Sequence, residues 1–428
     1  MLSSIEAMRS GDRDDLDLTD EATYERLRSP SRRALLRLSA GAGLSAGLGG
    51  GLLTALGPPA AAAAGGIVKP LPPELFISHG TNAEMRWEAM RRQGYLTPAD
   101  RFFVRNHTAT PLIDARTWSL KLWGTGLRGR PTEDSPVELT YEDLLDLPSE
   151  TLTASIECTG NGRGFFASQQ GQEASGTPWK LGAVGVARWH GVRLSTVLRR
   201  AGITREAVDI MPRGLDADYV DKGENLGRVR RPLPVAKAMK DVLLAYRMNG
   251  APLPADHGHP VRLVVPSWVG IASVKWLGDI QVADEPLFSP WNTRFYRLFG
   301  PAYPPDGSAP LTRMNVKSAF ELPWEAELPA ARPLALRGRS WSGGGRILRV
   351  EVSADGGATW RPARLRDRHP DPRGWARWEF GWQPSRPGPY ELLARATDET
   401  GATQPATVPF NRLGYLFGAV VRHPVTVI

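Results

Sequence analysis

Apolar and polar residues alternate from Leu152 to Cys158, and this period of two predicts a half-buried strand that carries the sulfur on its apolar face. Glycines at positions 160, 162 and 164 follow immediately. Because glycine reaches backbone conformations that are closed to other residues, this stretch predicts a loop that can approach a ligand closely. The pattern therefore predicts a thiol at the mouth of a glycine-rich loop, with a further glycine-rich excursion as far as Trp179.

Other stretches before residue 310 predict a mixture of strands and short helices. Residues 118–122 alternate as a strand, and Thr140 begins a capping-box-like sequence for a short helix. Apolar residues recur at helical spacing over 194–201, and the segment 233–249 is also helix-like. Residues 67–100 are instead rich in proline and irregular, which predicts a stretch wrapped over the surface of the domain that follows.

Past about residue 310 the pattern changes to short strands separated by glycine and proline turns. The predicted strands are 336–338, 346–352, 360–365, 378–380 and 390–396, with a hairpin-type turn at 355–357. Such a series predicts an immunoglobulin-like sandwich of roughly 110 residues, a module that more often supplies an interface than chemistry. The chain therefore divides into a leader (1–64), an α+β catalytic domain (65–309) and an all-β sandwich domain (310–428).

The leader has the parts of a secretion signal in the right order. Arg32 and Arg33 precede a weakly apolar run over 38–56, and an alanine tract with several A-x-A choices follows up to Ala64. The paired arginines indicate the twin-arginine route for folded cargo, and hence a periplasmic or extracytoplasmic location. The alternative is a disordered tail with a chance arginine pair, and the long acidic stretch before the arginines is unusual for a signal. Folded export suits a protein that acquires a cofactor before it leaves the cytoplasm.

The composition narrows the class of partner. Apolar content of 41% and charged content of 23% are those of an ordinary soluble globular protein, and no segment after the leader is long and apolar enough to span a bilayer. The net charge is +8, and residues 1–64 hold seven Lys/Arg and eight Asp/Glu, so the positive excess lies in the rest of the chain. No basic run with interleaved aromatic residues is present, so nucleic acid is not favoured as a partner. Arginines spread among the motifs suit a phosphate, sulfate or sulfite anion instead.

Cys158 is the only cysteine, so no disulfide can form within the chain. Arg163 lies close in sequence and would favour the thiolate, which is the form that reacts and binds metals. The alternative is a small buried apolar cysteine without chemistry. A bond to a metal would protect a lone thiol in an oxidising compartment.

Polar groups also gather at the ends of other apolar strands. The stretch 102–107, FFVRNH, ends in three groups able to hold an oxyanion, although an ordinary strand end would have the same sequence. The stretch 256–262, DHGHPVR, leads into a predicted strand at 263–266 and precedes Lys275, and its cations could cradle a phosphate. As a zinc site it fails, because no third and fourth soft ligand lies nearby. A loop at 214–218 carries two further carboxylates.

These motifs, taken in this order, resemble the sulfite oxidase family of molybdopterin-dependent oxidoreductases over about residues 96–428. They are F-F-x-R-N-H at 102–107, E-C-x-G-N at 157–161, M-N-G-x-P-L-P-x-D-H-G at 248–258, V-K-W-L-G at 274–278, W-S-G-G-G-R at 341–346 and D-G-G-x-T-W at 355–360. The resemblance is to exported bacterial-type members without a haem domain. It implies an α+β molybdopterin-binding domain followed by an immunoglobulin-like dimerisation domain, and hence a homodimer.

The resemblance also implies the cofactor, Mo-molybdopterin, and the residues that hold it. Cys158 would be the thiolate ligand of molybdenum beside the two dithiolene sulfurs of the pterin, and soft sulfur on this metal is reasonable chemistry. The residues at the family's cofactor-binding positions are Phe103, Arg105, Asn106, His107, Asp216, His257, Arg262, Ser273, Val274 and Lys275.

The implied catalytic residues are Cys158, Arg105, Arg163, Trp179 and Tyr296, the last four at the family's substrate-pocket positions. One position departs from the family, because Leu413 stands where a third pocket arginine is expected and Arg412 lies one place earlier. On a strand, that offset would turn the side chain to the other face. An excursion near residues 219–231 is also longer and more basic than expected, and could reshape the entrance.

The resemblance implies oxidation of sulfite, or a related sulfur oxyanion, to sulfate. The sequence contains neither a His-Pro-Gly-Gly haem signature nor Cys-x-x-Cys-His, so electrons are expected to pass to an external acceptor such as a cytochrome c. Two alternatives keep the cofactor and change the reaction: sulfoxide reduction and oxidation of a sulfane or thiosulfonate. A third alternative is a non-catalytic exported binding protein with an immunoglobulin-like adhesion module.

Overall fold

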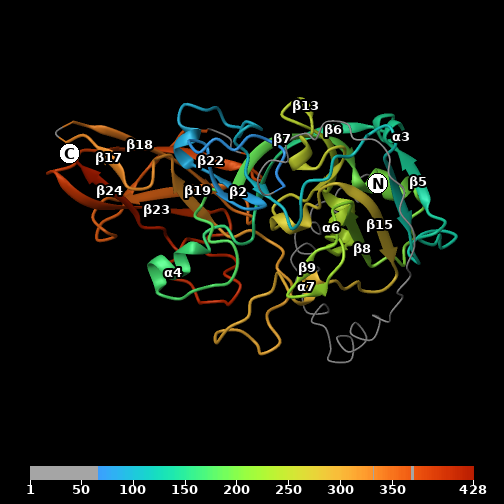
Figure 1. Ribbon diagram of the computed structural model, residues 1–428. Helices are drawn as coiled ribbons and strands as arrows, with labels where there is room; N and C mark the ends of the chain where they lie inside the picture. The colour runs from blue at the N-terminus through green and yellow to red at the C-terminus, as the bar shows by residue number, and fades with distance from the viewer. Residues whose placement is uncertain (1–65, 331, 368–370) are drawn as a thin grey trace, which may run out of the picture.

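The computed structural model describes residues 66–330, 332–367 and 371–428, so the predicted leader lies outside the described residues. The described chain forms an α+β part followed by a mostly-β part, as the sequence predicts. Figure 1 shows the later strands, coloured orange to red, at one end of the molecule, the teal, green and yellow strands towards the other, and the blue strand near residue 85 between them.

A small three-stranded sheet occupies much of the stretch that the sequence predicts to be irregular. Its strands are β1 (Phe76–His79), β2 (Asn82–Met85) and β3 (Val104–Arg105), and a 3-10 helix, η1 (Trp87–Met90), follows β2. The prediction for 67–100 is therefore wrong at 76–90. The strands form because Phe76, Ala83 and Val104 bury their side chains against Ile67, which gives this region a core of its own.

A five-stranded sheet carries the thiol loop at the end of one strand. β6 (Ser149–Glu157) pairs antiparallel with β7 (Val184–Arg193) along its whole length, from Ser149 opposite Val192 to Glu157 opposite Val184. The sheet continues through β12 (Leu243–Met248), β13 (Ala251–Pro252) and β14 (Arg262–Val264). The predicted strand is thus confirmed, and Cys158 is the first residue after it, but this end is not half-buried, because the polar residues Ser155 and Glu157 are buried as well. The glycine-rich stretch beyond it also contains a helix that was not predicted, α4 (Gly164–Gln170).

The prediction of a helix over 233–249 is wrong for most of this segment. Only α6 (Val235–Lys240) is helical, between the short strand β11 (Leu233–Pro234) and β12. Four consecutive residues of β12, Leu243 to Tyr246, are fully or almost fully buried, because the strand is covered on both faces. A short continuous apolar run has the same appearance in a buried strand and a buried helix, and here the sheet neighbours decide.

The second large sheet has the order β11-β8-β15-β4-β5. Its remaining strands are β8 (Asp209–Gly214), β15 (Leu277–Ala283), β4 (Ser119–Trp123) and β5 (Val137–Thr140). Two helices follow the predictions, α3 (Tyr141–Leu145), with a Thr140–Asp143 capping box, and α5 (Leu194–Arg200). Smaller elements complete this part: the hairpin β9 (Val220–Asp221) and β10 (Glu224–Asn225), helix α7 (Pro290–Thr293), and the 3-10 helices η2 (Ala255–His257) and η3 (Gly270–Ala272).

Two packed sheets form the C-terminal part. One has the order β16-β18-β22-β21 and the other β17-β24-β23-β19-β20. Their bounds are β16 (Lys317–Phe320), β17 (Ala326–Leu328), β18 (Leu334–Trp341), β19 (Ile347–Ser353), β20 (Arg361–Pro362), β21 (Arg364–Leu365), β22 (Trp375–Trp382), β23 (Gly388–Asp398) and β24 (His423–Val427). The predicted turn at 355–357 connects β19 to β20, and Trp378 lies at the centre of the core between the sheets.

The two parts share a hydrophobic cluster. Trp87 of η1 stacks on Trp341 of β18 with ring centroids 5.7 Å apart, and lies 6.1 Å from Trp375 of β22. Phe165 and Phe166 of α4 join the same cluster. The interface between the two parts is therefore a packed core.

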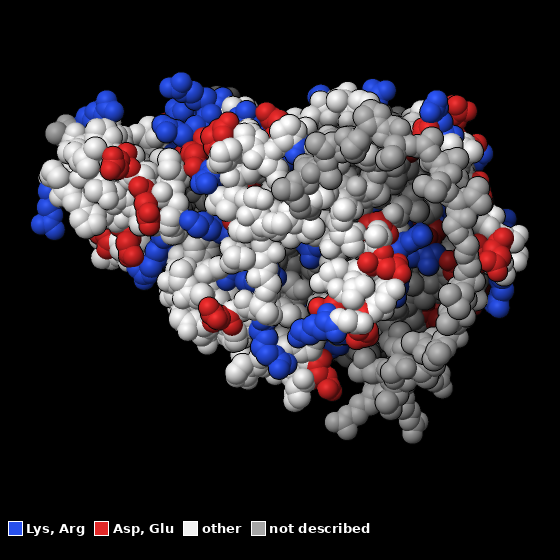
Figure 2. Space-filling model, viewed as in Figure 1, with Lys and Arg blue, Asp and Glu red and all other residues white. Residues whose placement is uncertain are grey.

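The surface mixes charges of both signs. Figure 2 shows Lys and Arg interspersed with Asp and Glu over the visible face, without one continuous basic band. Within 66–330, 332–367 and 371–428, no helix is long and apolar enough to cross a membrane.

Candidate functional site

Cys158 lies in a tight turn that is fastened to the start of β7. Its backbone N–H donates to the carbonyl of Ala183 at 2.9 Å, and its own carbonyl accepts from the N–H of Asn161 at 2.8 Å. The Asn161 side chain then accepts from the N–H of Ala183 at 3.0 Å. Cys158 is partly exposed and forms no disulfide, so the alternative of a fully buried apolar cysteine without chemistry does not hold.

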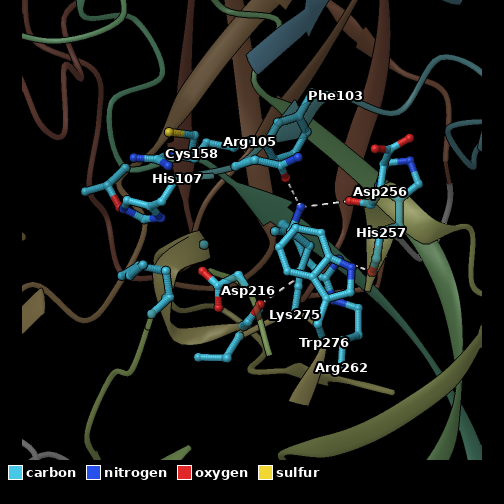
Figure 3. Close-up of a pocket in the computed structure, with 18 of the residues that line it drawn as sticks. Phe103, Arg105, His107, Cys158, Asp216, Asp256, His257, Arg262, Lys275 and Trp276 are labelled. Atoms are coloured by element: carbon cyan, nitrogen blue, oxygen red, sulfur yellow. Dashed lines mark hydrogen bonds between the residues drawn. The ribbon is translucent and has the colours of Figure 1, made fainter. Parts of the chain in front are cut away.

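One cavity opens on one side of the thiol (Figure 3), with about 710 Å³ of space between its walls. All ten residues at the predicted cofactor-binding positions line it: Phe103, Arg105, Asn106, His107, Asp216, His257, Arg262, Ser273, Val274 and Lys275. They come from β3 and the residues on either side of it, the loop after Gly214, η2, β14 and the segment between η3 and β15. Figure 3 shows Cys158 and His107 at one side of this cavity, and Asp256 and His257 at the other.

Buried cations dominate the side of the cavity away from the thiol. Arg262 donates to the carbonyls of His257 at 2.9 Å and Ser273 at 3.1 Å, and burial lowers its pKa to about 9. Lys275 donates to the Asn106 side chain and to the carbonyl of Asp256, and its pKa is lowered well below the usual range, mainly by burial and then by Arg262. Because buried positive charges are costly without a counter-charge, this wall suits a phosphate.

Several buried polar atoms in the cavity have no hydrogen-bond partner among the described residues. They are both carboxylate oxygens of Asp216, Nε2 of His257 and Oγ1 of Thr159. Burial also raises the pKa of Asp216 to about 6. Buried polar groups are normally satisfied, so these atoms indicate a polar ligand with N–H donors for Asp216.

The donor set fits molybdopterin. Asp216 would accept from the N–H donors of a pterin ring, and Arg262 and Lys275 would provide cations for its phosphate. Among the described residues, no three or more His, Cys, Asp and Glu side chains gather where they could hold a metal ion. A metal at Cys158 would therefore take its other ligands from a cofactor, as two dithiolene sulfurs would provide.

A second cavity, with about 1200 Å³ of space, lies on the other side of the thiol, and we call it the mouth. The mouth and the first cavity share Arg105, Asn106, His107, Cys158 and Tyr296. All the predicted catalytic residues line the mouth: Cys158, Arg105, Arg163, Trp179 and Tyr296. Cys158 thus lies at the junction of the cation-lined cavity and an arginine-lined opening.

Arg163 is held rigidly in the wall of the mouth. Its Nε donates to the carbonyl of Leu413 and one terminal nitrogen donates to the carbonyl of Thr177, both at 2.8 Å. A Cβ at Gly414 would lie 2.5 Å from Cγ of Arg163, and the φ of +59° there also favours glycine, whereas a Cβ at Gly160 would lie 2.5 Å from the Arg163 guanidinium and displace it. Burial lowers the pKa of Arg163, yet a guanidinium remains charged at neutral pH.

His107 and Tyr296 both line the two cavities, one as an acceptor and the other as a donor. Nε2 of His107 accepts from the indole N–H of Trp291 at 3.1 Å, and burial, with Arg105 nearby, lowers the His107 pKa well below its usual value. His107 is therefore neutral. Burial raises the pKa of Tyr296, so its hydroxyl remains a donor.

Sequence reasoning missed several residues that line the two cavities, among them Asp256, Trp276 and Tyr415, whereas Tyr219 and Lys222 lie in the excursion over 219–231 that it expected at the entrance. Tyr415 stacks on Tyr296 with ring centroids 5.0 Å apart. Asp256 and Trp276 lie inside the motifs at 248–258 and 274–278, so the predicted site residues beside them could have indicated their place in the cavity. Tyr415 has no such signal apart from its position beside Gly414.

The offset at 412–413 is resolved by the fold. Leu413 lines the mouth, whereas Arg412 is exposed and its guanidinium lies 5.8 Å from the centre of the Phe299 ring. The mouth therefore presents an apolar wall where the family's third arginine was expected.

Comparisons with known proteins agree with this geometry. A family model described as an oxidoreductase molybdopterin binding domain matches residues 107–291, and one described as a Mo-co oxidoreductase dimerisation domain matches 308–427. The chain is 36% identical to the mitochondrial sulfite oxidase of Mus musculus over 78% of this chain and 62% of that protein. It is 36% identical to the sulfite oxidase of Gallus gallus over 76% of this chain and 72% of that protein.

Among solved structures, the sulfane dehydrogenase SoxCD from Paracoccus pantotrophus matches with a TM-score of 0.67 and 30% sequence identity. The match covers 79% of this chain and 82% of that chain. With the two cavities that meet at Cys158, these matches show that the chain belongs to the sulfite oxidase family of oxidoreductases, whose cofactor is Mo-molybdopterin.

Proposed function

We propose that the protein oxidises sulfite, or a closely related sulfur oxyanion, and passes the electrons to an external acceptor. The observation that carries this proposal is the position of Cys158 between the cation-lined cofactor cavity and the mouth with Arg105 and Arg163. Net, sulfite and water give sulfate, two protons and two electrons. The bound molybdenum cofactor supplies the oxygen-atom transfer and accepts the electrons.

The residues of the mouth bind and orient the anion. Arg105 and Arg163 are the arginines that line it with the thiol, and they neutralise the charge of the substrate and stabilise the charge that develops on its oxygens. Because Arg163 is fixed by two carbonyls, little reorganisation is needed when the anion enters. The Tyr296 hydroxyl is the donor beside them that can hydrogen-bond an anion oxygen.

Elemental analysis and a substrate panel test the proposal. Protein matured in a molybdopterin-competent host is expected to contain molybdenum and to reduce an acceptor dye with sulfite. A protein that contains molybdenum but reduces a sulfoxide with reduced dye, and does not turn over sulfite, would contradict the proposed direction of the reaction. A protein without molybdenum would leave the non-catalytic binding protein as the better interpretation.

A second substrate class has one specific observation in its favour. Leu413, Trp179 and Phe295 give the mouth an apolar side, which could hold the organic part of a sulfane or thiosulfonate. The likeness to a sulfane dehydrogenase points the same way. A thiosulfonate in the panel separates the two, because a higher kcat/KM than for sulfite would favour the larger substrate.

We also propose that the protein is exported by the twin-arginine route and works as a homodimer with a cytochrome c or similar carrier. The Arg32-Arg33 leader supports export, and the match of residues 308–427 to a dimerisation domain supports the dimer. Replacing both arginines with lysine should hold the protein in the cytoplasm, and fractionation would measure this. Light scattering of the purified protein would measure the dimer.

A further inference from the structure

A buried ion pair joins the thiol turn to the C-terminal sandwich. Nζ of Lys317, on β16, donates to Oε1 of Glu157 at 2.7 Å and to the carbonyl of Asn161 at 2.9 Å. The Asn161 amide donates to the same Glu157 oxygen at 2.9 Å. Lys317 is 1% exposed and Glu157 2% exposed, so both charges are removed from water.

The partners of Lys317 lie on both sides of the metal ligand. Glu157 directly precedes Cys158, and Asn161 closes the turn by donating its N–H to the Cys158 carbonyl. Lys317 therefore binds both the residue before Cys158 and the residue that closes the turn. Lys317 belongs to the first strand of the sandwich, about 160 residues further along the chain.

We propose that Lys317 is a positioning residue that fixes the thiol of Cys158 relative to the cofactor cavity and the mouth. This inference rests on the proposed function, because it concerns the residue that holds the metal. The physical reason is that groups which orient a metal ligand control the geometry of the centre, even without touching the metal. The sandwich thus does more than form an interface: it supplies a cation on which the catalytic turn is built.

The test replaces Lys317 with methionine, which keeps the length of the side chain and removes its charge. We expect kcat for sulfite to fall about 10- to 100-fold, the range seen when an outer-shell partner of a metal ligand is lost. KM should change little, because Arg105 and Arg163 bind the anion and, among the described residues, neither forms a hydrogen bond with Lys317. The molybdenum content and the absorption band of the metal-bound thiolate should also change. Lys317→Arg should restore part of each property.

A matched control comes from a second buried ion pair, which lies within the sandwich and reaches the first part through two backbone carbonyls. Arg339 of β18 donates to Glu321 at 2.7 Å and to the carbonyls of Tyr95 and Gly94, and it is also 1% exposed. It has no hydrogen bond to the thiol turn among the described residues. Arg339→Met should therefore lower the melting temperature while leaving the absorption band and the kcat per molybdenum unchanged.

Three results would overturn the inference. The first is a Lys317→Met protein with normal kcat, molybdenum content and absorption band, while the unaltered protein oxidises sulfite. The second is equal loss in the Lys317→Met and Arg339→Met proteins, which would show that only general docking of the sandwich matters. The third applies if Lys317→Met does not fold. The double variant Lys317→Met/Glu157→Gln then leaves no unpaired buried charge, and a normal absorption band in this folded double variant would overturn the inference. An unaltered protein that holds molybdenum but does not oxidise sulfite would instead refute the proposed function.

Discussion

At the scale of single residues, the sulfur of Cys158 separates two chemical environments. Arg262, Lys275 and the unpaired Asp216 carboxylate lie on the cofactor side, whereas Arg163 lies on the mouth side. The residues of the cofactor side would hold a ligand bound to the sulfur, and a substrate would reach that ligand through the mouth. The thiol is therefore the group that connects the two cavities.

Replacing Cys158 with serine should therefore abolish activity and reduce the molybdenum content. The fold should survive, because the side chain is partly exposed and the two residues are similar in size, so the unfolding free energy should change by about 1 kcal/mol or less. Sulfite turnover, metal analysis and thermal unfolding measure the three effects. Retained turnover would refute the assignment of Cys158 as the metal ligand.

Asp216 predicts a pH dependence in the cofactor-free protein. Burial raises its pKa from 3.8 to about 6 in the folded state, so the folded protein binds a proton that the unfolded chain releases between about pH 4 and pH 6. Stability from this group is therefore lost as the pH rises through that window, by up to about 3 kcal/mol. Melting temperatures measured from pH 4 to pH 7 should show that Asp216→Asn removes this component. Parallel curves for the two proteins would contradict it.

Residue identities within motifs could be predicted from the sequence, because a motif fixes which residue types must meet one ligand. All ten predicted cofactor-binding residues line one cavity although they span residues 103 to 275. Tyr415 could not be found in this way. It reaches the mouth only because the chain returns from the sandwich and Gly414 adopts a φ of +59°, a feature that no periodicity records.

At the scale of elements, the hairpin β9–β10 lies in the segment near the mouth that is longer and more basic than the family resemblance predicts. Tyr219, Asp221 and Lys222 of this segment line it. Arg294 fastens the hairpin through Glu224 at 2.6 Å and Asp221 at 3.6 Å. The fastening residue lies two positions before Tyr296, so the hairpin and the predicted catalytic tyrosine are held by neighbouring residues.

Lys222 is an exposed cation on this hairpin, and it should attract an anionic substrate. One unit charge is worth about 1 kcal/mol at ion-pair distance in water, so Lys222→Gln should raise KM for sulfite about fivefold at low ionic strength and leave kcat unchanged. The effect should shrink in high salt. Lys121→Gln is the matched control, because Lys121 is an exposed lysine of β4 that does not line the mouth. A fall in kcat without a rise in KM would argue against an attractive role.

Elements with a clear period or cap were predictable, and continuous apolar runs were not. Thr140 and Asp143 form the expected capping box of α3, because this motif satisfies backbone donors locally. The run 243–246 folds as a strand because β7 and β14 flank it, and neither neighbour is visible from the run itself. Tertiary context decided that element.

At the scale of the whole molecule, the division into two parts is visible in the sequence, but their interdependence is not. The change from mixed elements to short regular strands predicts a sandwich after residue 310. Pattern alone does not show that Lys317 reaches the thiol turn, or that Phe417 packs on α4. These contacts join residues far apart in the chain, and only the three-dimensional arrangement determines them.

The shared core leads to a prediction about unfolding. Trp341 and Trp375 of the sandwich, with Phe417 beyond it, pack on Trp87 and α4 of the first part, so separating the two parts would expose a large apolar surface. Each buried aromatic side chain contributes roughly 1.5–3 kcal/mol, which is enough to couple the two parts. Calorimetry of the protein should therefore show one unfolding transition. Trp341→Ala should lower the temperature of this transition without splitting it into two. Two separated peaks in the unaltered protein would show that each part is stable by itself, and a truncation ending at residue 309 would then be soluble instead of aggregating.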